Sequence, residues 1–143
     1  MKRVYVASPF RGATTEETRQ NIVYARLCIL DSLERGEAPY LSHLLYTQVW
    51  SEDSREAGLL AGEAWRHVAG VVALYTDLGM TPGMQRARNW AERRMESVVL
   101  EERRVHWYAV DAAGPLETPS AWRRELHLLS LKVFPELDRE AYP

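Results

Sequence analysis

The chain has 143 residues, of which 46% are apolar, and this length fits one domain of ordinary size with a hydrophobic core. Its 18 basic and 20 acidic residues give a formal net charge of -2, so composition offers no electrostatic case for a DNA or RNA polymer or an anionic membrane as partner. We see neither an apolar run near the roughly 20 residues of a membrane helix nor a signal-peptide layout. Cys28 is the only cysteine, which excludes a disulfide framework, and we expect a cytoplasmic protein.

The N-terminal segment is predicted to be a short buried strand followed by a helix. Residues 4–7 form the strand, and Thr14 or Thr15 caps the helix. Thr14 and Glu17 have the spacing of a capping box, in which each side chain satisfies a backbone N–H of the first helical turn. Gly36 suits the end of this helix.

Residues 38–42 are predicted to be a second strand, which completes a strand–helix–strand unit typical of a parallel α/β sheet. After a loop with about one helical turn, Asp53 or Ser54 caps a second helix that ends at Gly70. The apolar stripe of this helix consists of Leu60, Ala61, Ala64, Trp65 and Val68. The uninterrupted apolar run at residues 71–75 is expected of a central parallel strand covered on both faces.

The third helix begins after Thr81, and its apolar spacing continues to about Arg103. Residues 105–110 are then the last strand. A rival interpretation makes residues 97–101 the strand, and the two are close, although "EERR" would make a poor turn. A final helix is predicted over residues 119–133.

Three polar loops directly follow predicted strands, and open parallel sheets bind ligands at the carboxyl ends of their strands. These loops are "SPFRG", "SHLLYTQ" and "TDLGMTPGM". Ser8, Arg11 and the first N–H groups of the first helix could hold a phosphate or carboxylate, and the helix after Thr81 offers a second positive end. The alternative is a plain turn with a solvated Arg11, and we weigh the two about evenly.

The four histidines match no metal motif, so no metal site is expected. His43 lies in a candidate pocket loop, where it could bond a ligand or equally the backbone. A structural role is favoured for His67, near a helix end, while His106 and His127 have no partners in the pattern. The glycine pattern at residues 79–84 is neither a dinucleotide fingerprint nor a P-loop, and we expect no cofactor. Core or interface positions are more typical for Trp65, Trp90, Trp107 and Trp122.

Several blocks between residues 3 and about 100 resemble the nucleoside 2-deoxyribosyltransferase-like superfamily, in particular its small bacterial and phage branch. They are "VYVASPFRG", Asn21, "PYLSHLLYTQ", "REAGLLAGEAW" and "LYTDLGMTPGMQRARNWA". The resemblance implies a single flavodoxin-like or Rossmann-like α/β domain over residues 1–143, with a parallel sheet and helices on both faces. It leaves the predicted strand and helix at 105–134 unmatched.

Active members of this superfamily cleave the N-glycosidic bond of a nucleoside or nucleotide and pass the sugar to another base or to water. Their nucleophile is a Glu directly after a Gly-Met-like pair, acting as in a retaining glycosidase. Here the pair is Gly83 and Met84, and the next residue is Gln85, whose amide is a poor nucleophile. Asp77, in the loop after the central strand, and Glu63 are therefore the remaining candidate catalytic residues.

The sequence thus predicts a protein that acts on or binds a nucleoside or nucleotide, as an N-glycosidase, as a deoxyribosyltransferase or as a binding domain. The alternative is a catalytically inactive nucleotide-binding or protein-interaction domain. The residues expected to line the pocket are Tyr5, Ser8, Phe10, Arg11, Gly12, His43, Gly83, Met84 and Gln85. If the domain only binds, Gln85→Glu should restore the nucleophile and base release.

We also expect at least a dimer. The resemblance implies that a neighbouring subunit often completes the site. The third helix looks long, and Trp90 lies beside its apolar stripe. Trp122 adds a further large apolar group in the unmatched C-terminal region.

Overall fold

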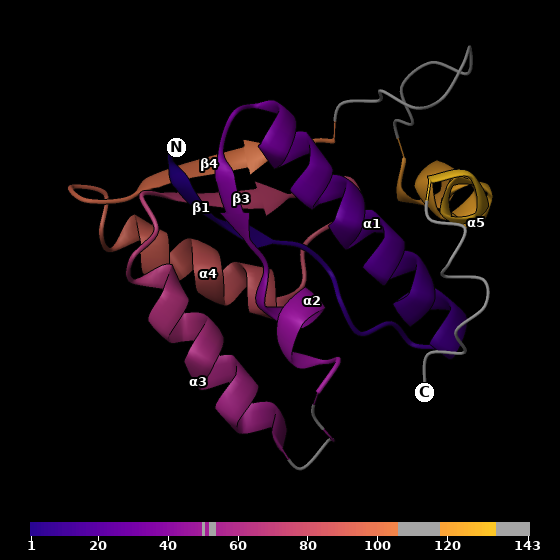
Figure 1. Ribbon diagram of the computed structural model, residues 1–143, viewed down its shortest axis with the longest axis horizontal. Coiled ribbons are helices and arrows are strands. Elements are labelled where there is room, and N and C mark those ends of the chain that lie inside the picture. Colours follow the sequence, from indigo (N-terminus) through magenta and orange to yellow (C-terminus); the bar gives the residue numbers. More distant parts are fainter. Residues whose placement is uncertain (50, 52–53, 106–117, 134–143) are drawn as a thin grey trace.

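Four parallel strands form the centre of the protein. The computed structural model describes residues 1–49, 51, 54–105 and 118–133. Within them the strands make one sheet in the order β2–β1–β3–β4, and each neighbouring pair is parallel (Figure 1). Their bounds are β1 Arg3–Ala7, β2 Ala38–Tyr40, β3 Val71–Tyr75 and β4 Val99–Arg103. The predicted single-domain α/β fold with a parallel sheet is confirmed.

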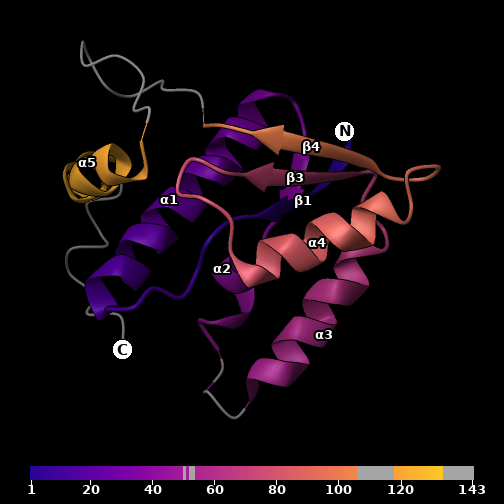
Figure 2. The ribbon, with the colours of Figure 1, turned by 180° about the vertical axis from the view of Figure 1, so that it is seen from behind.

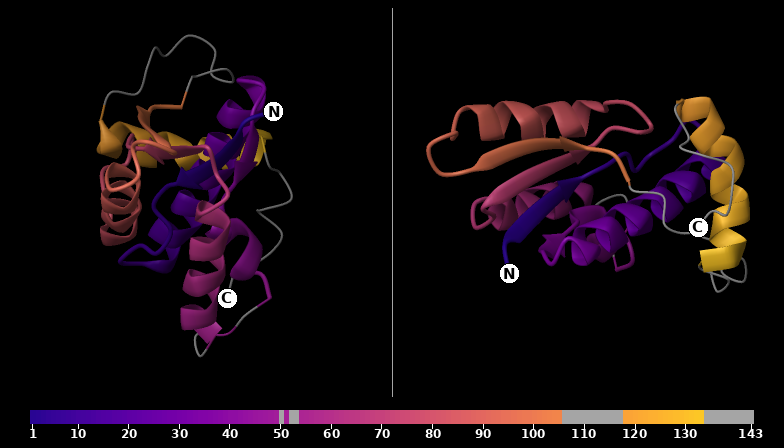
Figure 3. Two further views of the ribbon diagram at one scale, coloured as in Figure 1. Left: turned by 90° about the vertical axis from the view of Figure 1, so that its left-hand side faces the viewer. Right: turned by 90° about the horizontal axis from the view of Figure 1, so that it is seen from above.

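Helices cover both faces of this sheet. Their bounds are α1 Thr15–Glu34, α2 Ser42–Tyr46, α3 Arg55–Arg66, α4 Pro82–Glu92 and α5 Pro119–Val133. Helices α1 and α5 lie on one side, and α4 lies on the other with α3 beside it (Figures 2 and 3). No helix of the described residues is long and apolar enough to span a bilayer.

Strand β3 is buried along its whole length because its side chains alternate between two cores. Val71, Ala73 and Tyr75 pack in the core that α1 and α5 cover. Val72 and Leu74 pack in the second core, which contains the buried side chains of α4. The apolar run at 71–75 therefore has the central position that the sequence predicted for it.

Helix α1 begins with the predicted cap. The Thr14 hydroxyl accepts the N–H of Glu17 at 3.1 Å. The Glu17 carboxylate accepts the N–H of Ala13 at 2.6 Å, one residue before the partner expected in a capping box. Gly36 has a φ of 75°, a left-handed conformation that glycine adopts without steric cost, and it lies just beyond the helix end.

Three predicted boundaries were wrong. Strand β2 stops at Tyr40, since the chain turns into α2 at Ser42, and α3 ends at Arg66 rather than Gly70. Helix α4 ends at Glu92 instead of continuing to about Arg103, and β4 overlaps the rival interpretation of 97–101. Pairing with β3 decides this, since a segment in which three of five residues are charged becomes a strand there. Of the favoured strand at 105–110, residues 106–110 lie outside the described residues.

The apolar stripe of α3, which was expected to face the core, faces solvent instead. Leu60, Trp65 and Val68 are 60%, 51% and 44% exposed. The buried residues of α3 are instead Gly62 and Arg66. A methyl group on Gly62 would lie 2.9 Å from Cβ of Ser42, so the missing side chain lets α2 and α3 approach closely.

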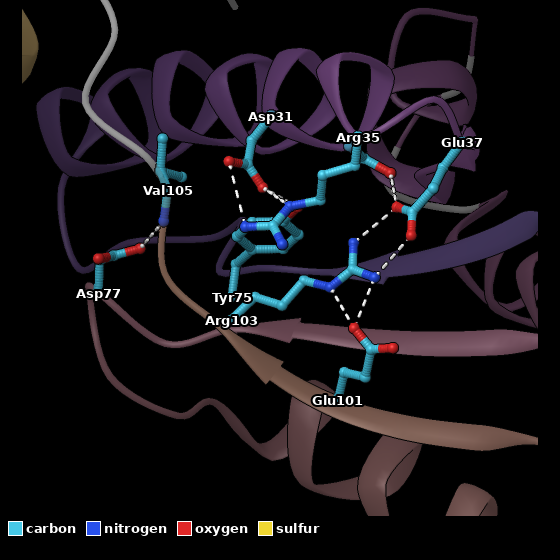
Figure 4. Close-up of polar contacts among 9 residues, drawn as sticks. Asp31, Arg35, Glu37, Tyr75, Asp77, Glu101, Arg103 and Val105 are labelled. Carbon is cyan, nitrogen blue, oxygen red and sulfur yellow. Dashed lines mark hydrogen bonds and ion pairs between the residues drawn. The ribbon is translucent and has the colours of Figure 1, made fainter.

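Arg103, the last residue of β4, is the centre of a buried ionic network (Figure 4). Its Nη1 and Nη2 atoms donate to both carboxylate oxygens of Glu37 at 2.7 and 2.8 Å. Its Nε donates to Glu101 at 2.8 Å, and the Ser32 hydroxyl donates to Glu37 at 2.7 Å. The pair with Glu37 links β4, at one edge of the sheet, to the residue that precedes β2, at the other edge.

A second buried carboxylate, Asp31 of α1, lies in the same region of the core (Figure 4). It accepts the hydroxyl of Tyr75 at 2.6 Å and Nε of Arg35 at 2.8 Å. Burial, together with the hydrogen bond to Asp31, raises the pKa of Tyr75, so this phenol keeps its proton. These contacts hold α1 against the central strand.

We expect Arg103→Met to lower the free energy of unfolding by about 3–5 kcal/mol, because Glu37 would remain charged, buried and without its cation. The matched control is Arg88→Met, which removes an ion pair to the exposed Glu102 and should cost at most about 1 kcal/mol. Urea unfolding at neutral pH measures both variants. Equal losses in the two would contradict the central role of Arg103.

The same pair makes stability depend on pH. Hydrogen bonds from Arg103 lower the pKa of Glu37 in the folded protein. The stabilisation is therefore complete above the unfolded-state pKa of about 4.3 and is lost as the pH falls through the lower folded-state pKa. In urea titrations between about pH 7 and pH 3, Glu37→Gln should flatten this acid-induced loss. An unchanged pH profile in Glu37→Gln would refute the assignment.

Candidate functional site

The loops after β1 and β3 leave the same edge of the sheet. The two strands are parallel neighbours, and Ala7 at the end of β1 pairs with Leu74 near the end of β3. Both loops therefore start at the carboxyl edge, where parallel α/β sheets hold ligands. The side chains expected to line one pocket nevertheless have different surroundings.

Contacts with α1 fix the loop between β1 and α1. Nδ2 of Asn21 donates to the carbonyl of Phe10 at 2.8 Å, and the N–H of Gly12 donates to the Thr18 hydroxyl at 3.0 Å. A Cβ atom on Gly12 would lie 2.3 Å from Cβ of Glu17, so only glycine fits beside the first turn of α1. Gly12 thus has a packing role within the loop.

Ser8, Phe10 and His43 form a cluster at this edge. The rings of Phe10 and His43 stack with centroids 5.0 Å apart, and Oγ of Ser8 lies 3.4 Å from Nε2 of His43. His43 belongs to the first turn of α2, so the cluster joins the segments that follow β1 and β2. Burial lowers the pKa of His43 to about 3, because the charged imidazolium would lose its hydration. At neutral pH the imidazole is uncharged and offers one donor and one acceptor.

Side chains around the start of α1 accept three N–H groups, of which one, that of Glu17, belongs to the helix. The N–H groups of Gly12, Ala13 and Glu17 donate to Thr18, Glu17 and Thr14 respectively. An anion at this position would have to displace the Glu17 carboxylate. These three N–H groups are thus satisfied within the chain, Arg11 is exposed, and the anion site expected at the start of α1 stays a prediction.

Asp77 is 2% exposed, and other groups already engage its carboxylate. Its Oδ2 accepts the hydroxyl of Tyr24 at 2.6 Å and the N–H of Val105 at 3.0 Å (the latter contact is drawn in Figure 4). Its Oδ1 lies 3.5 Å from Nε of Arg104. Burial raises the pKa of Tyr24 well above the usual range, so its hydroxyl stays protonated and donates. This arrangement holds three segments together and leaves Asp77 poorly placed to attack a substrate.

The other candidate carboxylate, Glu63, is exposed on α3 and pairs with Nη2 of Arg66 at 2.8 Å. Arg66 itself is buried with its guanidinium carbon over the rings of Tyr5 and Trp90, at 5.6 and 5.1 Å from their centroids. Tyr5, expected in the pocket, thus lies on the α4 side of the sheet against a cation.

The three candidate residues at the start of α4, Gly83, Met84 and Gln85, differ in burial. Met84 is buried in the core between α4 and the sheet, whereas Gln85 is exposed. Nε2 of Gln85 donates to Oδ1 of Asn89 at 2.9 Å along the helix. A Cβ on Gly83 would meet no atom closer than 3.7 Å. Neither Met84 nor Gln85 joins the cluster of Ser8, Phe10 and His43.

Sequence reasoning missed Tyr24 and Arg66, which hold the two carboxylates expected to be catalytic. The signal for Tyr24 was present, because a polar hydroxyl at a buried position of α1 needs a partner. Nothing in the sequence marks Arg66 as buried. No group of three or more His, Cys, Asp or Glu side chains in the described part of the chain could hold a metal ion.

Comparison with known proteins gives one match. A family model with the description "Domain of unknown function (DUF7768)" matches residues 2–100, which span β1 to the start of β4. No curated protein and no solved structure matches the chain.

Alanine substitutions at Gly12 and Gly83 test whether each glycine is required for close packing. We expect Gly12→Ala to lower the free energy of unfolding by about 1–3 kcal/mol, since its Cβ would overlap the first turn of α1. Gly83→Ala should be neutral or stabilising by up to about 1 kcal/mol, because alanine favours the helix and its Cβ would make only ordinary contacts at 3.7 Å or more. Denaturant unfolding of the two variants measures both effects. A stable Gly12→Ala protein would show that the loop is not held in this way.

Proposed function

The chain belongs to the DUF7768 family of unknown function, and we propose that the carboxyl edge of its sheet binds a nucleoside or nucleotide without cleaving it. The observation that carries this proposal is the cluster of Ser8, Phe10 and His43 after β1 and β2. It combines an aromatic face, a hydroxyl and an uncharged imidazole at the edge where parallel sheets place ligands.

The chemistry of these groups suits a nucleoside. The partly exposed ring of Phe10 can stack on a base, and such a contact is worth about 1–3 kcal/mol in other proteins. The hydroxyl of Ser8 and the neutral imidazole of His43 can each donate and accept a hydrogen bond to base or sugar atoms. The exposed guanidinium of Arg11, in the same loop, can pair with a phosphate group.

The carboxylates argue against cleavage. A retaining transfer of the sugar needs a carboxylate that can reach the anomeric carbon. Asp77 is buried and hydrogen-bonded to Tyr24 and Val105, while Glu63 is bound to Arg66. Binding without turnover therefore accounts for the arrangement better than catalysis does.

Titration calorimetry and thermal shift with nucleosides and nucleoside monophosphates test the binding site. A ligand at 100 times its dissociation constant should raise the free energy of unfolding by about 2.7 kcal/mol. Phe10→Leu should weaken binding about tenfold by removing the stacking surface. Arg11→Gln should weaken binding of monophosphates alone, and Arg93→Gln, at the far end of α4, serves as the matched control. The absence of any shift with this panel would refute the proposal.

The second candidate function is glycosyl transfer or hydrolysis with Asp77 as a relocated nucleophile. We expect no base release from deoxynucleosides or nucleoside monophosphates by the native protein. Because the side chain of Gln85 is exposed beside Asn89, we also expect none from Gln85→Glu, in contrast to the expectation from sequence. Chromatography of the reaction mixture detects the free base.

A matched pair of variants separates catalysis from structure at Asp77. Both variants affect the hydrogen bond between Tyr24 and Asp77: Tyr24→Phe removes it, and Asp77→Asn weakens it. Only Tyr24→Phe keeps the carboxylate. If the native protein releases base, and only Asp77→Asn abolishes this release, then Asp77 is catalytic and our proposal of binding alone is wrong.

A further inference from the structure

Helix α3 presents an unpartnered apolar stripe to solvent. With about 100° of turn per residue, Ala57, Leu60 and Ala64 follow one line on the side opposite the buried Gly62 and Arg66, and the apolar Val68 comes two residues after the helix ends. All four are exposed, and α3 lies at the border of the molecule in Figures 1 and 2. A stripe of this kind on a helix is normally covered by another surface.

The tryptophans that the sequence offered for a dimer interface are not available. Trp90 is 5% exposed and packs in the core between α4 and the sheet. Trp122 is buried in the opposite core, edge-on to Tyr24 at 5.5 Å. Trp65, on α3, differs from these two tryptophans because it is 51% exposed.

We propose that α3 binds α3 of a second copy of this chain, antiparallel and related by a two-fold axis. Two-fold pairing brings one patch against itself, so the patch must be self-complementary. An antiparallel register centred at Gly62 puts Leu60 opposite the partner's Ala64. It also brings Val68 to within one residue, about 1.5 Å along the axis, of the level of the partner's Ala57. Large side chains thus meet small ones along the contact.

The charges of α3 fit the same arrangement. In this register Glu56, near the start of the helix, lies within one residue of the level of the partner's His67, which follows the end of the helix. The carboxylate can accept an N–H of that imidazole, and the contact occurs twice in the dimer. The ring of His67 packs edge-on against Trp90 at 5.1 Å, which holds it in place at the surface. Antiparallel packing also sets the positive end of each helix dipole beside the negative end of the other.

The contact relies on one helix of 12 residues from each copy, so the interface is at the small end of the range for specific association. We therefore expect a reversible dimer with a dissociation constant of about 1–100 µM. A parallel arrangement would bring Glu56 against the partner's Glu56, so the charges select the antiparallel one.

Sedimentation equilibrium of the full chain over about 1–300 µM tests the pairing. The weight-average mass should rise from 16.5 kDa towards twice that value. Leu60→Arg should weaken the dimer more than about tenfold, because it inserts two charges into the apolar contact. Met95→Arg is the matched control, since Met95 is 75% exposed and lies after α4, and it should leave the equilibrium unchanged.

A charge exchange tests the register. Glu56→Lys and His67→Glu should each weaken association, and the double variant should restore it to within about threefold of the native value. A native chain that stays monomeric, or a dimer that Leu60→Arg leaves intact, would overturn the proposal. A dimer that Leu60→Arg disrupts but the double variant does not restore would overturn the antiparallel register. Circular dichroism checks that each variant is folded, as expected for changes at exposed positions.

Discussion

The carboxyl edge of this protein depends on one buried carboxylate. Asp77 joins Tyr24 of α1, the loop after β3 and Val105 beyond β4 through hydrogen bonds of 2.6 to 3.0 Å. Leaving such a group without partners in the core would cost several kcal/mol, so each of the three segments is fixed relative to the others. The same bonds that make Asp77 structurally necessary engage its Oδ2 atom, and burial keeps the carboxylate from solvent.

Because Asp77 has this structural role, the candidate ligand-binding groups are those that follow β1 and β2. The cluster of Ser8, Phe10 and His43 carries no formal charge at neutral pH, because burial lowers the pKa of His43 to about 3. Uncharged hydrogen-bonding groups beside an aromatic ring suit recognition of a base and sugar. They supply no anionic group to stabilise a cationic sugar, which is why we propose binding rather than glycosyl transfer.

Elements that are specified by local sequence signals lie where the sequence predicted them. Strand β1, the Thr14 cap of α1, strand β3 and the Thr81 cap of α4 lie where residue types and periodicity placed them. Each is specified within a few residues, by apolar runs or by a hydroxyl that can accept an N–H. Of the candidate site, the sequence also predicted that Ser8, Phe10 and His43 lie near one another, since the topology of parallel strands brings their carboxyl ends together.

Composition and pattern by themselves therefore determined a single α/β domain with a parallel sheet. Tertiary contacts decided the rest. The charged segment 99–103 is a strand because it pairs with β3 and Arg103 finds Glu37. Helix α3 turns its apolar stripe outward because Gly62 and Arg66 fit the space beside α2 and Trp90. These features depend on contacts between residues that are distant in the sequence. The pattern of residue types along the chain does not specify which residues will meet across the core.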